Sequence, residues 1–274
     1  MSADTVDQEF SFTNADFERV RKLIYGHAGI SLHEGKKAMV YSRLSRRLRD
    51  TPYRAFAPYL DALERGPADA PEWQEFVNCL TTNLTSFFRE EHHFHALAEE
   101  LKPFQGKAVR IWCCAASTGE EPYSIAMICH ESLRSMSQVG LVCSDIDTQV
   151  LATAKRGVYA ADSRGLSAER LRHFFMRGTG ANAGRIRFKP ELAKGIDFRP
   201  LNLMHDRWNL GDPFHMVFCR NVMIYFDGPT QRKVLERIHR VMQPKGLLFV
   251  GHSENFTEAK DLFRLRGKTI YERV

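Results

Sequence analysis

The chain has 274 residues, of which 43% are hydrophobic and 26% are charged, a composition typical of globular rather than disordered or fibrous proteins. The length allows one large domain or two unequal ones. Apolar runs such as 246–251 are far shorter than the roughly 18 residues that cross a bilayer, and the polar start MSADTVDQEF lacks the apolar core of a signal peptide. We therefore expect a cytoplasmic protein without direct membrane insertion.

Positive charge is concentrated near the N-terminus. The formal net charge is +6, and residues 19–54 contain ten Lys and Arg against two acidic residues, so the rest of the chain is slightly acidic. Such a patch attracts an anionic partner. Charge alone leaves a nucleic acid, a membrane surface and an acidic protein as candidates.

Residues 1–80 are expected to form an all-helical domain. Apolar residues recur at helical spacing between 14 and 80, and Gly29, Thr51-Pro52 and Gly66-Pro67 mark breaks between about four helices. Thr13 and Asp16 stand where a capping side chain and its partner begin a helix. The next segment, 81–105, is interpreted as a linker followed by a helix from about residue 89.

The rest of 81–274 alternates short apolar runs with helical segments, which predicts an α/β fold with a doubly wound, mostly parallel sheet. The expected strands are 109–114, 140–144, 216–219 and 247–250, the helices 122–132, 148–156 and 229–242, and a closing strand pair lies around 263–265 and 269–273. The alternation breaks between 158 and 203. There, 185–188 and 196–198 are interpreted as a small antiparallel hairpin, within an inserted β-subdomain spanning 173–200.

The segment after the first expected strand has the residue types of a ligand-binding turn. It reads IWCCAASTGEEPY over 111–123, and its small residues let the backbone approach a ligand at the carboxyl end of the strand. Pro122 suits the start of a helix. An ordinary strand-to-helix turn remains the alternative for this segment.

The second expected strand ends in SDID, residues 144–147. Nucleotide-binding sheets place a carboxylate here to accept hydrogen bonds from ribose hydroxyls, and Asp145 is the candidate. Its alternative role is to cap the following helix, which Asp147 or Thr148 would serve equally well. With no diphosphate-type glycine loop and with two acids at 120–121, the pattern favours a cationic adenosine compound such as S-adenosylmethionine.

At this point the sequence resembles the chemotaxis receptor methyltransferase family, CheR. Five strings carry the resemblance: TNLTSFFRE (82–90), AASTGEEPYSIA (115–126), SDID (144–147), FCRNVMIYF (218–226) and GHSEN (251–255). They occur in order and span most of the chain. The resemblance implies a Rossmann-like class I methyltransferase sheet with an N-terminal all-helical domain and a small antiparallel β-subdomain insertion.

The resemblance also implies an activity and its residues. The expected enzyme is a protein-glutamate O-methyltransferase that uses S-adenosylmethionine, releases S-adenosylhomocysteine, and esterifies glutamates on the cytoplasmic helical bundle of bacterial chemoreceptors. Arg89 and Tyr225 are the candidates nearest the transferred methyl, although a structural salt bridge and core packing are their alternative roles. The implied cofactor residues are Asn83, Thr85, Arg89, Glu120, Asp145, Asn202, Leu203, Arg220 and Asn221.

A basic helix is expected to meet the receptor. At 100° per residue the apolar side chains of this helix fall on one side, and its cations, Lys36, Arg43, Arg46 and Arg47, fall on another. A solvated face is the usual meaning of such charge, but the resemblance points to the surface that binds acidic receptor helices. In some family members the β-subdomain also binds a C-terminal receptor pentapeptide as an added strand, and the full-length loop around 178–184 favours this here.

Other motifs are given weaker readings. His92, His93 and His95 form a cluster with Glu91, and the six cysteines have no CxxC pair, so no metal site is expected.

The rival functions are a nucleic-acid methyltransferase and a non-catalytic adaptor. This sequence lacks the prolyl catalytic loop expected of a nucleic-acid methyltransferase. Intact candidate site residues argue against the adaptor.

Overall fold

The computed structural model describes residues 9–133 and 136–274, so the first eight residues of the predicted helical domain lie outside it. The described chain divides into two compact units. The first contains residues up to 82 together with 225–227, and the second contains 83–224 together with 228–274. Among the described residues, no helix combines the length and the apolar character needed to span a bilayer.

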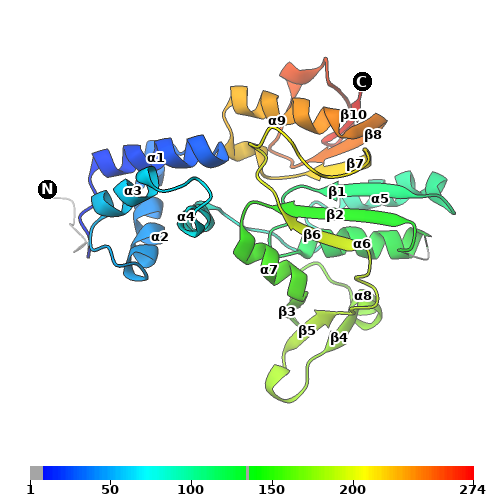
Figure 1. Ribbon diagram of the computed structural model, residues 1–274. Coiled ribbons are helices and arrows are strands. Elements are labelled where there is room, and N and C mark those ends of the chain that lie inside the picture. The colour runs from blue at the N-terminus through cyan, green and yellow to red at the C-terminus, as the bar shows by residue number, and fades with distance from the viewer. Residues whose placement is uncertain (1–8, 134–135) are drawn as a thin grey trace, which may run out of the picture. The chain divides into compact units, whose positions relative to one another are not determined.

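From residue 9 onward, the first unit is a bundle of four α-helices (Figure 1). They are α1 (Asn14–Ala28), α2 (Lys37–Arg49), α3 (Phe56–Arg65) and α4 (Pro71–Leu80), with a 3-10 turn, η1 (Glu34–Lys36), before α2. The predicted cap of α1 is confirmed: Thr13 and Asp16 form a reciprocal capping box, and the helix ends at Gly29 with a φ of 71°. The apolar face of each helix is buried in the bundle, as the helical spacing predicts.

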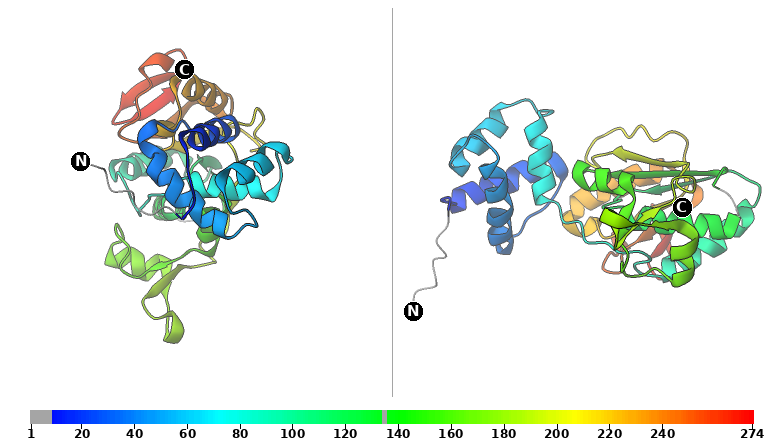
Figure 2. Two further views of the ribbon diagram at one scale, coloured as in Figure 1. Left: turned by 90° about the vertical axis from the view of Figure 1, so that its left-hand side faces the viewer. Right: turned by 90° about the horizontal axis from the view of Figure 1, so that it is seen from below.

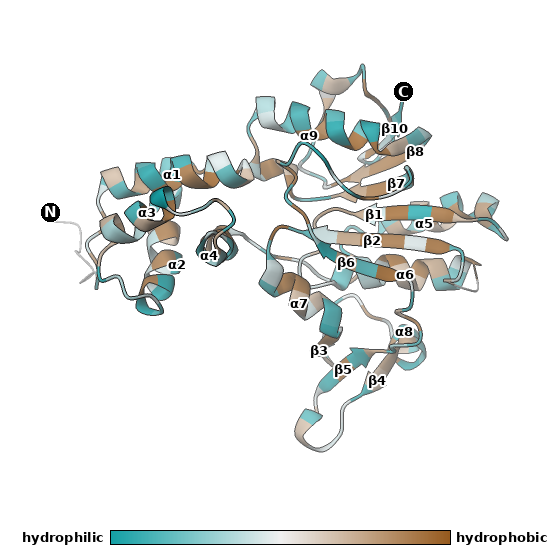
Figure 3. Cartoon of the chain, in the orientation of Figure 1, coloured by the Kyte–Doolittle hydropathy of each residue, from teal (hydrophilic) through white to brown (hydrophobic). Residues whose placement is uncertain are grey.

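The second unit is built on a seven-stranded sheet in the order β6-β2-β1-β7-β8-β10-β9. Its strands are β1 (Val109–Cys113), β2 (Val139–Asp145), β6 (Ile196–Pro200), β7 (Phe214–Cys219), β8 (Met242–Val250), β9 (Phe263–Gly267) and β10 (Ile270–Arg273). The first five in this order pair in parallel, and β10 pairs antiparallel with β8 and β9. Figure 3 shows that the central strands are largely hydrophobic, because such strands are buried on both faces.

Helices connect these strands: α5 (His92–Leu101), α6 (Glu120–Leu133), α7 (Thr148–Arg156), α8 (Ala168–Phe174) and α9 (Gly228–Arg240). The remaining short 3-10 turns are η2 (Lys102–Phe104), η3 (Gly180–Asn182), η4 (Met223–Tyr225) and η5 (Thr257–Ala259). The strand order switches sides at β1: β2 is added on one side of it, and β7 is added later on the other. In open α/β sheets this switch point is where ligands bind.

A small three-stranded antiparallel sheet, in the order β3-β5-β4, projects from the second unit (Figure 2). Its strands are β3 (Val158–Ala160), β4 (Phe175–Arg177) and β5 (Arg185–Phe188). The expected hairpin between 185–188 and 196–198 is wrong. Residues Ile196–Pro200 instead form β6, which pairs in parallel with β2 in the large sheet, from Leu141 opposite Ile196 to Asp145 opposite Pro200.

The error has a physical cause. Alternation in a run of three to five residues predicts a strand but does not determine which strand it joins. The edge of β2 offers backbone groups that need partners, and β6 satisfies them. The fold class, a parallel α/β sheet with an all-helical unit and a small antiparallel sheet, is confirmed.

Candidate functional site

The carboxyl ends of four neighbouring strands bring the predicted cofactor residues together within the second unit. Because β6, β2, β1 and β7 are parallel and adjacent, the segments that follow them share one edge of the sheet. These segments supply Asn202 and Leu203 after β6, Asp145 at the end of β2, Glu120 after β1, and Arg220 and Asn221 after β7. Their convergence was not visible in the sequence spacing alone.

The turn after β1 is shaped by small residues. Ser117 has a φ of 48° and Gly119 a φ of 103°. A Cβ atom at Gly119 would stand 2.6 Å from the hydroxyl of Tyr159 and 2.9 Å from the Cβ of Ala154, so only glycine fits. Helix α6 begins directly after it at Glu120, two residues earlier than predicted from Pro122. Glu120 is half-buried, and its carboxylate accepts a 2.6 Å hydrogen bond from the Thr118 hydroxyl.

Asp145 is buried at the end of β2. Its Oδ2 accepts from the backbone N–H of Ser117 over 2.8 Å, and its Oδ1 accepts from the backbone N–H of Asp147 over 2.9 Å. Burial raises the pKa of Asp145 to about 6, although these N–H donors oppose the shift. The backbone N–H of Ile146 also acts on this carboxylate. Because a carboxylate offers about four lone-pair sites, a ligand hydroxyl can still donate to it.

Asp147, not Asp145, caps α7. Its Oδ1 accepts from the backbone N–H groups of Gln149 and Val150, and its Oδ2 accepts from Nδ2 of Asn83 over 2.8 Å. The carbonyl of Asn83 in turn accepts from the hydroxyl of Ser117. Asp147 therefore takes the capping role that was the alternative for Asp145. Its bond to Asn83 and the bond from Ser117 join the segment that begins at Asn83 to the turn after β1.

Thr85 and Arg89 lie further along the same segment, and both are half-buried. The guanidinium of Arg89 donates from Nη1 to the carbonyl of Leu84 over 2.8 Å. This bond curls the segment back on itself, and the described contacts do not tie the Arg89 side chain to an acidic partner. The salt-bridge alternative for Arg89 thus has no counterpart among the described residues.

Arg220 is engaged inside the protein. Its side chain has no exposed surface, forms an ion pair with Glu121, approaches Glu90 to 3.4 Å, and donates from Nη2 to the carbonyl of Arg89 over 2.6 Å. Burial would raise the pKa of Glu90, but Arg220 and His252 hold it at about 2. The Arg220 guanidinium therefore supports the Arg89 segment through its two Nη atoms. Glu90 and Glu121 were missed because nothing in the sequence pairs them with Arg220.

The segment after β6 lies beside Asp145. The backbone N–H of Leu201 donates to the carbonyl of Asp145 over 2.9 Å, which extends the strand pairing by one step. Asn202 and Leu203 are buried, and Oδ1 of Asn202 accepts from the backbone N–H of Met204. The position of these two implied cofactor residues therefore follows directly from the β6 pairing.

Tyr225 belongs to the first unit, whereas Arg89 belongs to the second. The carbonyl of Tyr225 accepts from the backbone N–H of Ser31 over 2.8 Å, and the hydroxyl of Tyr25 donates to the carboxylate of Asp227. Residues 225–227 thus pack with the helical bundle.

The four predicted receptor-binding cations differ in their surroundings. Arg43 donates to the carbonyls of Leu80 and Thr81 at the end of α4. Arg47 forms a two-bond ion pair with Glu72, which raises the pKa of Arg47 above its usual range. Lys36 and Arg46 are exposed, and neither has a side-chain partner among residues 9–133 and 136–274.

The histidine cluster is organised differently from the prediction. The side chains that converge are those of Glu90, His92 and His93, and not Glu91 or His95. His93 is fully buried, and burial, followed by Arg220, lowers its pKa to about 4. Glu90 also lies 3.4 Å from the guanidinium of Arg220, so this cluster adjoins the ion pairs that Arg220 forms below the Arg89 segment.

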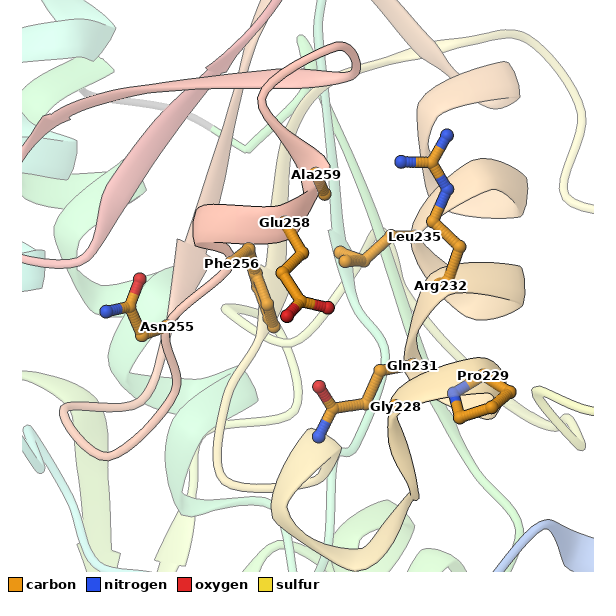
Figure 4. A pocket seen from close by; sticks show the side chains of 9 residues that line it. All are labelled: Gly228, Pro229, Gln231, Arg232, Leu235, Asn255, Phe256, Glu258 and Ala259. Carbon is orange, nitrogen blue, oxygen red and sulfur yellow. The ribbon is translucent and has the colours of Figure 1, made fainter.

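A cavity of about 530 Å³ lies between the start of α9 and the loop after β8. Figure 4 shows the polar side chains of Gln231, Asn255 and Glu258 around it, with Phe256 on the loop. Its lining residues include none of the predicted cofactor residues. The sheet edge, rather than this cavity, carries the candidate site.

The residues at the sheet edge fit S-adenosylmethionine. Gly119 lets the turn after β1 pack closely against Tyr159 and Ala154. Asp145, beside this turn, keeps acceptor capacity for a ligand hydroxyl group. The carboxylate of Glu120 suits a cationic ammonium group. No glycine-rich diphosphate loop is present in this described turn, which agrees with a ligand that carries no phosphates.

Comparisons with known proteins identify the family. The model of the CheR methyltransferase SAM-binding domain matches residues 83–271, and that of the CheR all-alpha domain matches residues 15–81. The chain is 49% identical to chemotaxis protein methyltransferase 2 of Pseudomonas aeruginosa, over 97% of this chain and 95% of that protein. It is 47% identical to the chemotaxis protein methyltransferase of Escherichia coli, over 96% and 92%. The chain therefore belongs to the CheR methyltransferase family, as its sequence motifs predict.

Proposed function

We propose that this protein transfers the methyl group of S-adenosylmethionine to glutamate side chains on the cytoplasmic helical bundle of bacterial chemoreceptors, giving glutamate 5-O-methyl esters in chemotactic adaptation. The family match across both units carries this conclusion. The protein would act in the cytoplasm, where these receptor glutamates lie, and would release S-adenosylhomocysteine. The proposed functional domains are 1–80 and 81–274, with 81–105 as linker and helix; the division of the chain near residue 82 supports this.

S-adenosylmethionine supplies an electrophilic methyl on a sulfonium centre. Because a glutamate carboxylate is already a nucleophile at neutral pH, the protein needs no strong general base and contributes mainly by alignment and exclusion of water. Arg89 is proposed to orient the incoming carboxylate, since its side chain has no acidic partner among the described residues. Tyr225 is proposed to hydrogen-bond that carboxylate or to line the path of the methyl group.

The cofactor is proposed to lie along the carboxyl ends of β6, β2, β1 and β7. In this assignment Asp145 holds the ribose and Glu120 faces the methionine end. The residues around the adenine and sulfonium end are Asn202, Leu203, Arg220 and Asn221. Asn83 and Thr85 complete the site from the linker. The hydrogen bonds that join Asn83 to Asp147 and Ser117 support its inclusion.

The basic face formed by η1 and α2 is proposed to bind the acidic receptor helices. Among the four predicted cations, Lys36 and Arg46 are the strongest candidates, because Arg43 and Arg47 already bind groups of their own unit. Such contacts would act on association and on its salt dependence more than on the chemical step. A nucleic-acid partner is not proposed.

The small antiparallel sheet is proposed to bind a C-terminal receptor pentapeptide by strand addition. In the order β3-β5-β4 the outer strands are β3 and β4, so each has an edge at which a peptide strand could pair. This binding would tether the enzyme to receptors that carry such a peptide. The insertion predicted from the sequence, 173–200, covers β4 and β5 but omits β3 and includes the β6 strand of the large sheet.

The proposed function is tested by methyl transfer to chemoreceptor cytoplasmic fragments. Radiolabelled S-adenosylmethionine is supplied, and mild alkali is then added to release label from carboxyl methyl esters as volatile methanol. We expect base-labile label with the wild-type protein, none with a receptor fragment whose acceptor glutamates are replaced by alanine, and little with Arg89→Ala. Cofactor binding without transfer to any of several receptors would favour the adaptor instead.

A further inference from the structure

The string GHSEN at 251–255 helps to identify the family, but no role in the site was assigned to its residues. In the structure, Glu254 lies in the loop after β8 and is only 4% exposed. Its carboxylate accepts from three backbone N–H groups: those of Gly251 over 2.6 Å, Asn221 over 2.9 Å and Met223 over 2.7 Å. One buried side chain therefore joins the ends of two neighbouring strands, β7 and β8.

The loop that Glu254 holds has an unusual backbone. Asn221 has a φ of 57°, a left-handed conformation that side chains other than glycine adopt at a cost. Successive N–H groups around such a residue turn towards one point and form a site for an anion. Here the anion is the carboxylate of Glu254, supplied by the chain itself.

Gly251 provides the space for this arrangement. A Cβ atom at this position would stand 2.9 Å from Cγ and 3.0 Å from the backbone nitrogen of Asn221. A side chain at Gly251 would therefore push Asn221 out of place. At the other end of the loop, Nε2 of Gln231 donates to the carbonyl of Met223 over 2.9 Å. The side chain of Gln231 is visible in Figure 4 at the start of α9.

We propose that Glu254 is a positioning residue for the methyltransferase site: with Gly251, it holds the loop after β7 so that Asn221 meets the cofactor. The inference rests on the proposed cofactor role of Asn221. Glu254 itself touches neither cofactor nor substrate in this assignment. Without its carboxylate, three backbone N–H groups lose their acceptor, and the strained backbone at Asn221 loses the contacts that maintain it.

The first test compares Glu254→Gln with wild type, by calorimetric titration with S-adenosylhomocysteine and by steady-state kinetics of methyl transfer. We expect the dissociation constant and the KM for S-adenosylmethionine to rise about tenfold or more, with a smaller change in kcat, because a glutamine amide cannot accept from all three donors. Glu254→Asp, which keeps the charge with a shorter reach, should recover part of the affinity.

A matched control separates positioning from stability. Asp16→Asn removes another buried carboxylate that accepts a backbone N–H, that of Thr13, in the helical unit. It should lower the thermal midpoint without changing the affinity for S-adenosylhomocysteine. If Glu254→Gln behaves in the same way, with a lower midpoint and wild-type affinity, the positioning role is refuted.

A double-mutant cycle tests the route through Asn221 and does not require Glu254→Gln to fold. Gly251→Ala and Asn221→Ala should each weaken cofactor binding, and the double variant should bind no more weakly than Asn221→Ala alone. Additive losses would contradict the inference. Wild-type affinity in Asn221→Ala would instead overturn the proposed cofactor role of Asn221 and, with it, this inference.

Discussion

Asn83 and Asp147 are 64 positions apart and are joined by a 2.8 Å hydrogen bond from the amide of Asn83 to Oδ2 of Asp147. The other oxygen of the same carboxylate caps α7. One side chain therefore starts the helix after β2 and fastens the linker segment beside Asp145. This link places the first predicted cofactor residue at the sheet edge.

Removing one partner of this link should separate its two roles. Asn83→Ala keeps the cap of α7 and should weaken binding of S-adenosylhomocysteine while reducing the free energy of unfolding by only about 1 kcal/mol. Asp147→Ala loses the cap as well and should cost roughly 1–2 kcal/mol more. Urea unfolding and calorimetric titration measure the two effects. Unchanged affinity in both variants would remove Asn83 from the site.

Cofactor affinity should depend on pH through Asp145. Its pKa is raised to about 6, so the carboxylate is largely ionised at pH 7.5 and largely protonated at pH 5. Ribose hydroxyls donate to the ionised form, so affinity should fall below pH 6, by at most about tenfold per pH unit.

The same raised pKa means that the folded protein binds this proton more tightly than the unfolded chain, so Asp145 favours folding at low pH and opposes it above pH 6.

The control for this dependence is Asp145→Asn, which cannot ionise. We expect this variant to bind S-adenosylhomocysteine more weakly than wild type at pH 7.5, and with little change between pH 5 and 7.5. A wild-type pH profile that persists in Asp145→Asn would assign the titration to another group.

Arg89 should affect turnover more than cofactor affinity. Arg89→Ala removes the proposed partner of the substrate carboxylate, and we expect kcat to fall by about a hundredfold or more while the affinity for S-adenosylhomocysteine falls less. Arg89→Lys keeps the charge but not the planar fork, and should recover only part of the activity. Equal losses of kcat and affinity would leave Arg89 as a cofactor ligand alone.

Two neighbouring arginines on α2 form a matched pair. Arg46→Ala should weaken association with receptor fragments, most clearly at low ionic strength, and leave the free energy of unfolding unchanged. Arg47→Ala breaks the ion pair with Glu72 and should lower that free energy by up to about 1 kcal/mol. Receptor binding at two salt concentrations and urea unfolding distinguish them. A salt-independent effect of Arg46→Ala would argue against an electrostatic docking face.

Several features follow from local sequence because their causes lie within a few residues. The capping box of α1 needs only Thr13 and Asp16, three positions apart. The apolar runs of β1 and β2 reflect burial on both faces, so they predict buried strands wherever the sheet is placed. The location of Asp145 at a strand end follows from the same runs, as does the alternation that predicts a parallel α/β sheet.

Other features depended on which surfaces meet in the folded chain. Residues 196–200 join β2 rather than β5, Arg220 pairs with Glu90 and Glu121, and Glu254 holds Asn221 from the loop after β8. These partners lie tens to more than a hundred positions apart. Spacing along the chain predicts burial and local conformation. The partner of a strand edge or of a buried charge is decided only by tertiary packing, because a buried polar group must be paired and the fold determines which groups lie within reach.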